Sequence, residues 1–414
     1  MRPLTIAGAL LILAACTDPT TMTGVPDATM APGGLSANVV SESSTDLWER
    51  IITGETGPGS LYQLYLPREW NGTAVFYAHG IRDVLEPVSL RDQDNLGAIR
   101  DQLGQRGIAV AYSSYSENGY AEKDGVQRTH QLRGLFTSQF GTPARSLIVG
   151  HSLGGLVALN VAEKFADQYD GAAAFCGVVG GTQAEFNHMV TTRLLFDLFY
   201  PGILPGTYDQ IPPGLIIDQA KQGQIVAAIT ANPLGLLAIA SIEQANLQFQ
   251  LGSPQMQQQM VTSLITALSF HARGADNVLP LMNGFPFDNM NTIYTASAVP
   301  LLPPQVLAGV LAMVEANAPR RAGDPSAMSY TERNFTPSGA LRIPTITLHN
   351  TADPLVPFFH EQLLAENVGN AGATGLLVQR SKPVYGHCQF TVPEQIQAIV
   401  DLDTWVATGI KPAS

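Results

Sequence analysis

Charged residues are scarce in this sequence, at 14% of positions, against about 25% in an average globular protein. The formal net charge is −12, and no basic run occurs, since Arg320-Arg321 is the densest basic pair. Binding of nucleic acid needs clustered Lys and Arg, so the sequence excludes a nucleic-acid partner. The chain is 45% hydrophobic over 414 residues, which excludes intrinsic disorder and provides for a sizeable core.

The N-terminus contains one short apolar run, residues 4–15, preceded by Arg2. It is shorter than the roughly 20 residues that a membrane-spanning helix needs, and it fits the apolar region of a signal peptide. Its end, Leu13-Ala14-Ala15-Cys16, resembles the bacterial lipobox. The resemblance implies removal of residues 1–15 and a lipid anchor at Cys16, so that the exported protein is held at a membrane in the periplasm or at the cell surface. The alternative is an ordinary secretory signal with an incidental cysteine.

Cysteine is rare as well, and only Cys176 and Cys388 follow Cys16. This usage agrees with export. The sequence cannot show whether the two residues meet in a disulfide or are two small buried hydrophobic side chains.

The order of expected elements predicts an α/β fold with a mostly parallel central sheet flanked by helices. Residues 16–45 are rich in Thr, Ser, Pro, Gly and Ala and predict a flexible tether. Residues 46–181 and 341–410 alternate strands and helices and form the predicted catalytic domain, whereas residues 182–340 predict a helical insertion. The expected strands are 61–66, 73–78, 107–113, 146–149, 172–179, 345–348 and 376–379; the expected helices are 95–105, 126–140, 156–166, one starting at Ser253-Pro254 with Ser253 as its cap, 305–316, 360–368 and 393–407.

The strongest chemical signal is Gly150-His151-Ser152-Leu153-Gly154, a G-x-S-x-G pattern between an apolar strand and a helix. A sharp strand-to-helix turn exposes the serine hydroxyl and needs glycines where side chains would clash. The pattern therefore predicts Ser152 as a nucleophile.

A serine hydroxyl needs a base, and the base needs an orienting carboxylate. Asp353 lies just past the strand 345–348, and His387 lies between the last strand and the last helix. Both are predicted as catalytic. An oxyanion would be stabilised by two backbone N–H groups, for which we expect Leu153 and, in the loop after strand 73–78, Ile81. His79 beside it is expected to be structural.

Four motifs stand out: the loop with His79-Gly80, the GHSLGG turn around Ser152, the acid loop around Asp353 and the histidine loop around His387. The last three follow the order Ser, acid, His that is typical of α/β-hydrolases. On these motifs the chain resembles the α/β-hydrolase superfamily and is similar to bacterial secreted carboxylesterases and lipases. The resemblance implies that residues 182–340 form a cap or lid over the active site, and that the chemistry proceeds through an acyl-enzyme.

The expected function is therefore a serine carboxylic ester hydrolase acting on hydrophobic or short-chain acyl esters, with no metal and no organic cofactor. The alternatives are an amidase or peptidase of the same fold, and a non-catalytic surface lipoprotein built on a hydrolase scaffold. The expected partners are an ester substrate and, through Cys16, a membrane; the oligomeric state stays open. Two roles are open for the apolar cap residues, among them Leu194, Leu195, Phe196 and Tyr200. They line a surface that binds an acyl chain, or they pack the cap onto the body of the protein, and we favour the packing.

Overall fold

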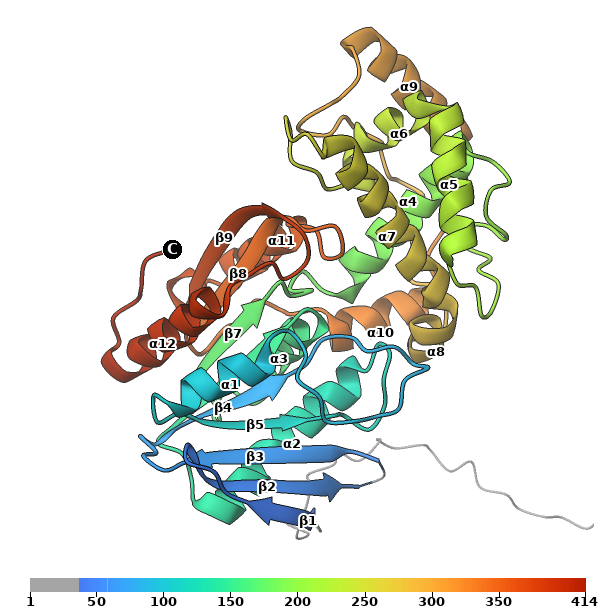
Figure 1. Cartoon of the computed structure of the whole chain (residues 1–414). Helices are drawn as coiled ribbons and strands as arrows, with labels where there is room; N and C mark the ends of the chain where they lie inside the picture. Colours follow the sequence, from blue (N-terminus) through green and yellow to red (C-terminus); the bar gives the residue numbers. More distant parts are fainter. Residues whose placement is uncertain (1–36, 58) are drawn as a thin grey trace, which may run out of the picture. The chain divides into compact units, whose positions relative to one another are not determined.

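A computed structural model describes residues 37–57 and 59–414. The predicted signal peptide, residues 1–15, and the predicted lipidation site at Cys16 lie outside the described residues. The described strands form one sheet in the order β1-β2-β3-β5-β4-β6-β7-β8-β9 (Figure 1). Their bounds are β1 Ala37–Ser43, β2 Trp48–Thr56, β3 Leu61–Pro67, β4 Thr73–Ala78, β5 Ala109–Ser113, β6 Arg145–His151, β7 Gly171–Phe175, β8 Thr345–Ala352 and β9 Leu377–Tyr385.

The sheet is antiparallel at one end and parallel elsewhere. β1, β2, β3 and β5 pair antiparallel with one another in that order. The strands from β5 through β4, β6, β7 and β8 to β9 pair in parallel. Parallel strands bring their carboxyl ends to one edge, where ligands bind in open α/β sheets. The predicted α/β class with a mostly parallel sheet is confirmed.

Both faces of the central strands are buried because helices cover them. On β4, Val75 and Tyr77 face a core that includes side chains of α1 and α12, whereas Ala74 and Phe76 face a core that includes α2 and α3. A strand buried on both faces reads as a continuous apolar run rather than an alternating one, as residues 73–78 do. The flanking helices are α1 Leu96–Gly104, α2 Glu122–Phe140, α3 Leu153–Lys164, α11 Phe359–Asn370 and α12 Val392–Thr408.

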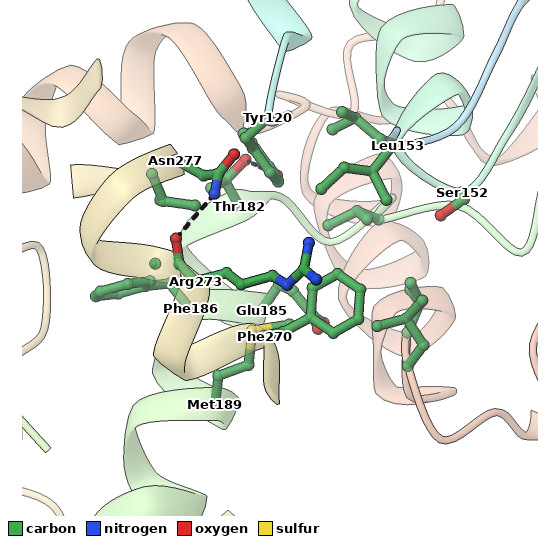
Figure 2. Close-up of a pocket in the computed structure, with 16 residues that line it drawn as sticks. Tyr120, Ser152, Leu153, Thr182, Glu185, Phe186, Met189, Phe270, Arg273 and Asn277 are labelled. Atoms are coloured by element: carbon green, nitrogen blue, oxygen red, sulfur yellow. Dashed lines mark hydrogen bonds between the residues drawn. The ribbon is translucent and has the colours of Figure 1, made fainter. Parts of the chain in front are cut away.

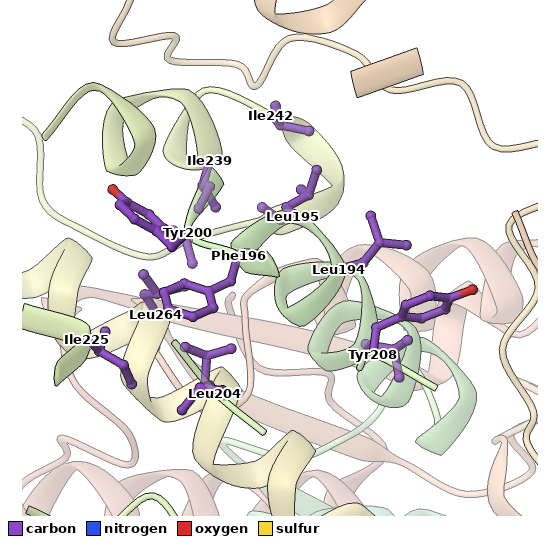
Figure 3. Close-up of a cluster of buried hydrophobic side chains, with 14 of the residues drawn as sticks. Leu194, Leu195, Phe196, Tyr200, Leu204, Tyr208, Ile225, Ile239, Ile242 and Leu264 are labelled. Atoms are coloured by element: carbon purple, nitrogen blue, oxygen red, sulfur yellow. The ribbon is translucent and has the colours of Figure 1, made fainter. Parts of the chain in front are cut away.

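Between β7 and β8 the described chain is helical and has a hydrophobic core of its own (Figure 3). Leu194, Leu195, Phe196 and Tyr200 belong to this core, so these apolar residues pack the inserted helices together. We call this insertion the cap. Its helices are α4 Thr182–Phe199, α5 Gln219–Ala231, α6 Pro233–Ala240, α7 Met256–Asn277, α8 Leu279–Met282, α9 Pro304–Asn317 and α10 Pro325–Phe335.

Among the described helices, none is by itself long and apolar enough to cross a membrane. Helices α5 and α6 reach that length and composition only as a pair, and they are bent by 97° where they join.

The prediction of a flexible tether over residues 16–45 is wrong for residues 37–43, which form strand β1 and pair with β2. Val39 and Val40 on this edge strand are 46% and 67% exposed. The strand is thus defined by backbone pairing and carries no buried face, which is why its side chains gave no strand signal. Strand β2 was also missed.

The helix predicted to start at Ser253-Pro254 begins later, as α7 at Met256, and Ser253 does not cap it. The hydroxyl of Ser253 instead accepts a hydrogen bond from the N–H of Gln255 at 3.1 Å. Such a local side-chain turn competes with helix formation.

Candidate active site

Ser152 occupies a strained turn between β6 and α3. Its backbone has φ 56° and ψ −124°, a region that residues with side chains rarely adopt. The Ser152 N–H donates to the carbonyl of Phe175 at the end of β7 at 2.9 Å, which fixes the turn to the sheet. The structure therefore places Ser152 at the carboxyl end of a central parallel strand, with the first turn of α3 directly after it.

Three glycines allow this turn to pack. A Cβ on Gly150 would lie 1.9 Å from the carbonyl oxygen of Gly154, and one on Gly154 would lie 2.1 Å from that of Ala78. A Cβ on Gly155 would lie 2.7 Å from the Cα of Gly177. These are backbone contacts that cannot be relieved by moving a side chain, so the G-x-S-x-G-G pattern is explained by close packing of the turn against β4 and β7.

His387 and Asp353 form a hydrogen-bonded pair at the same sheet edge. His387 Nδ1 lies 2.7 Å from Asp353 Oδ2. The fully buried Asp353 also accepts two backbone hydrogen bonds at Oδ1, from Leu355 N–H at 2.9 Å and Val356 N–H at 3.0 Å. These donors hold the carboxylate in place. A carboxylate oxygen accepts from a ring N–H, so this geometry favours the hydrogen on Nδ1 of His387, and in the neutral ring Nε2 is then the proton acceptor.

Within residues 37–57 and 59–414, no hydrogen bond joins Ser152 Oγ to His387. Hydrogen bonds of catalytic groups are often long in the absence of substrate. The structure thus brings together Asp353 and His387 directly, and it places Ser152 at the carboxyl end of β6, which β7 separates from β8.

A disulfide joins the histidine loop to the sheet. Cys388, which directly follows His387, is bonded to Cys176, which directly follows β7. The Cys176 N–H donates to the carbonyl of Leu348 on β8 at 2.8 Å. The sequence left open whether Cys176 and Cys388 form a disulfide, and the structure shows that they do. The two sulfurs and a His387 ring nitrogen lie within 4.8 Å of one another, but sulfurs bonded to each other are not thiolate ligands.

His349 is a buried residue that contacts the acid loop around Asp353. Its two ring nitrogens face two acceptors, the Val356 carbonyl at 2.8 Å and the Glu361 carboxylate at 3.2 Å. Burial alone would lower the pKa of His349, but the hydrogen bond and charge of Glu361 and the charge of Asp353 outweigh it and raise the pKa. His349 thus fixes the segment that holds Asp353.

The two residues predicted for the oxyanion hole, Ile81 and Leu153, line the same pocket as Ser152. Figure 2 shows Leu153 beside Ser152. Leu153 is the first residue of α3, so its N–H has no acceptor within the helix. Gly80 lies directly against the serine, because a Cβ there would be 3.2 Å from the Cβ of Ser152. The loop after β4 therefore reaches Ser152.

Buried and half-buried polar side chains hold this loop. Gln93 Nε2 donates to the Ile81 carbonyl at 3.2 Å, and Arg82 Nε donates to Gln93 Oε1 at 3.1 Å. His79 stacks on Tyr115 at a centroid distance of 3.8 Å, and burial lowers the pKa of His79 to about 3. A neutral, packed His79 is in line with the structural part expected for it.

The pocket at Ser152 lies between the sheet edge and the cap, with about 700 Å³ of space between its side chains, open mouth included. Most of its wall is apolar. Two charged side chains also line it, Glu185 from α4 and Arg273 from α7; Arg273 Nη1 donates to Asp83 at 2.9 Å. Neither residue was expected from the sequence, because each is one of several polar or charged residues in its helix and belongs to no motif. The remaining lining residues include Tyr120, Val178, Thr182, Phe186, Met189, Phe270, Asn277, Val278, Leu355 and Val356.

Comparison with known proteins agrees with these features. Residues 93–202, which include the Ser152 turn, match the family model described as putative esterase. A curated relative, the o-phthalyl amidase of Xanthobacter agilis, is 31% identical over 124 residues, which cover 29% of this chain and 26% of the relative. The chain thus spans about a quarter of the length of that relative.

Solved structures similar to this chain share little sequence with it. An esterase from Aspergillus oryzae is 14% identical with a TM-score of 0.46, and covers 92% of this chain and 86% of its own. Candida antarctica lipase A is 12% identical with a TM-score of 0.44, covering 91% and 83%. The esterase LipA from Xanthomonas oryzae is 12% identical with a TM-score of 0.39, covering 90% and 95%.

The parallel strands are ordered as in the α/β-hydrolase fold. In that fold too, a strained serine turn, an acid and a histidine follow successive strands, as they follow β6, β8 and β9 here. The family match over residues 93–202 supports a hydrolase that acts on esters. The protein has the α/β-hydrolase fold, with a helical cap between β7 and β8.

Proposed function

We propose that the protein is a serine hydrolase of carboxylic esters, with Ser152 as nucleophile, His387 as general base and Asp353 as the carboxylate that orients it. The observation that supports this most is the hydrogen bond of 2.7 Å between His387 Nδ1 and Asp353. In the neutral ring this bond keeps the hydrogen on Nδ1, so that Nε2 is the nitrogen that can accept a proton, on the same sheet edge as the strained Ser152.

The proposed reaction has two steps. His387 Nε2 takes the proton of Ser152 Oγ as the oxygen attacks the ester carbonyl, and the N–H groups of Leu153 and Ile81 bind the oxyanion. The C–O bond to the alcohol breaks, the alcohol takes the proton from His387, and an acyl group stays on Ser152. His387 then removes a proton from water as the water oxygen attacks the acyl carbonyl. The bond from the acyl carbon to Ser152 Oγ breaks, Oγ takes the proton back from His387, and the acid leaves.

The pocket favours esters with an apolar acyl or alcohol group. Its wall is largely aliphatic and aromatic, with Leu153, Phe186 and Phe270 among its residues. Apolar walls with a few placed polar groups are typical of small-molecule sites. We propose hydrophobic or short-chain acyl esters as substrates.

Covalent labelling with a fluorophosphonate probe tests the nucleophile. We expect Ser152→Ala to abolish labelling and the hydrolysis of p-nitrophenyl acetate. Ser269→Ala is the matched control, since this hydroxyl only donates to Ile265 within α7 and both signals should persist. Unchanged labelling of Ser152→Ala would refute the assignment, and no labelling of the native protein would favour a non-catalytic binding protein.

One observation favours a second candidate, hydrolysis of an amide. The curated relative that matches 29% of this chain is named an o-phthalyl amidase, and Arg273 gives the pocket a cation that would suit the free carboxylate of a phthalyl group. Rates for an o-phthalyl monoester and the corresponding o-phthalyl amide separate the two. We expect the ester to react faster; a faster amide would favour the second candidate.

We also propose that the protein is exported and anchored through lipid on Cys16. The disulfide between Cys176 and Cys388 supports an oxidising compartment, since disulfides are rare in the cytosol. Replacing Cys16 by Ser should move the protein from the membrane fraction to the soluble fraction. Retention in the membrane fraction would refute lipidation at this residue.

A further inference from the structure

Glu185 is a buried carboxyl group in the wall of the Ser152 pocket, and the proposed reaction does not use it. The residue lies in the first turn of α4, the first helix of the cap, and is 5% exposed. In Figure 2 it lies among Phe186, Met189 and Phe270. A polar group placed in an apolar pocket wall fixes which ligand groups can bind there.

One oxygen of Glu185 is held by the protein. Glu185 Oε2 lies 2.7 Å from His360 Nε2, and His360 Nδ1 lies 3.0 Å from the backbone nitrogen of Gly180. A backbone N–H can only donate, so Nδ1 of His360 accepts and Nε2 carries the hydrogen. Burial lowers the pKa of His360 to about 3, in line with this neutral form. His360 therefore donates to Oε2 of Glu185.

The other oxygen, Oε1, is buried and has no hydrogen-bond partner among the described residues. Leaving a buried polar atom unpaired is unfavourable, because the atom loses its hydrogen bonds to water and gains none in the protein. Attachment of α4 to α11 needs only the bond from His360 to Oε2, so it does not explain Oε1. Burial raises the pKa of Glu185 to about 7, and because Oε2 already accepts from His360, a proton on this carboxyl sits on Oε1.

We propose that Glu185 Oε1 selects esters that carry a hydroxyl group on the part held in this pocket. The inference rests on the proposed ester hydrolase function. A hydroxyl both donates and accepts, so it pairs with Oε1 whether or not the carboxyl is protonated, and the aromatic and aliphatic side chains around Glu185 pack against the apolar body of the substrate. Glu185 is then a specificity-determining residue, and it takes no part in bond making.

Two matched pairs of esters test this selection. The first pair is methyl 3-(4-hydroxyphenyl)propanoate and methyl 3-(4-methylphenyl)propanoate, which differ on the acyl side. The second is 2-(4-hydroxyphenyl)ethyl acetate and 2-(4-methylphenyl)ethyl acetate, which differ on the alcohol side. Hydroxyl and methyl are similar in size and lie far from the carbonyl, so each kcat/KM ratio reports the contact with the distant group.

We expect the native protein to favour the hydroxyl member of at least one pair by about tenfold or more, the equivalent of one hydrogen bond of about 1.4 kcal/mol. Glu185→Met should bring that ratio to one or below, and Glu185→Gln should retain a preference because an amide still hydrogen-bonds. A structural role alone would lower both members of a pair equally. Glu122→Gln is the matched control, since Glu122 is a second buried carboxyl, bonded to Asn160 and outside the pocket.

A native protein without preference in both pairs would overturn the inference, and so would a preference that persists in Glu185→Met. The native measurement decides even where Glu185→Met does not fold. If p-nitrophenyl acetate is hydrolysed and Ser152 is labelled while both kcat/KM ratios stay at one, the inference about Glu185 is refuted and the proposed function stands. Absence of both hydrolysis and labelling would instead refute the proposed function and this inference with it.

Discussion

Removal of the Cys176–Cys388 disulfide is expected to weaken both the fold and catalysis. The bond links the end of β7 to the residue after His387, with Cα atoms 5.3 Å apart and a sequence separation of 212 residues. Replacing both cysteines by alanine leaves the helices and strands intact and releases the loop that carries the proposed base.

The expected loss of stability follows from the length of the closed loop. In the chain-entropy model a link across 212 residues removes about 5 kcal/mol of conformational freedom from the unfolded chain at 25 °C, and measured disulfides contribute about 2–4 kcal/mol. We expect the double variant to lose about 3–5 kcal/mol of unfolding free energy. Because a small displacement of a catalytic group lowers rates strongly, we also expect kcat to fall by about tenfold or more.

Urea unfolding of the native protein and of Cys176→Ala/Cys388→Ala measures the first effect, and p-nitrophenyl acetate hydrolysis at low urea measures the second. Dithiothreitol should lower the unfolding midpoint of the native protein and leave that of the double variant unchanged. An unfolding free energy within about 1 kcal/mol of the native value, together with an unchanged kcat, would refute the reasoning.

Three further predictions concern single positions. Burial raises the pKa of Glu122 from 4.5 to about 7, so the folded state holds this proton more tightly and loses stability as the pH rises from about 4.5 to 7. Urea unfolding at pH 5 and pH 8 should show about 2.5 kcal/mol more loss in the native protein than in Glu122→Gln, and equal losses would contradict the raised pKa. Asp353→Asn should lower kcat by about 10⁴-fold in steady-state ester hydrolysis, and a loss below tenfold would remove Asp353 from the triad. A Cβ at Gly154 would lie 2.1 Å from the Ala78 carbonyl oxygen, so we expect Gly154→Ala to lower kcat by about 100-fold. Gly309→Ala is the control, since Gly309 has open space around it and its substitution should change kcat little. Equal kcat values for the two variants would argue against close packing at the turn.

The α/β body was predictable because its signals are local. Ser152, Asp353 and His387 each follow a strand within a few residues, so strand position and chain order predicted their place at the sheet edge without knowledge of distant contacts. Parallel strands place their carboxyl ends at one edge, and the pairing of His387 with Asp353 follows from that geometry.

The features that escaped prediction depend on contacts between distant segments. Glu185 and Arg273 reach the pocket only because the cap folds back over the sheet edge, and neither belongs to a local motif. The disulfide joins residues 212 positions apart, a pairing that no sequence spacing specifies. Strand β1 has no buried face, so its pairing with β2 left no periodicity in residues 37–43.

Mass analysis of the protein during turnover tests the central claim most directly. After rapid mixing with p-nitrophenyl acetate and acid quenching, we expect a burst of p-nitrophenol, an intact mass raised by one acetyl group, and that group on the peptide containing Ser152. Ser152→Ala should show neither burst nor acetylation. An acetyl group on another residue, or hydrolysis that persists in Ser152→Ala, would contradict the account.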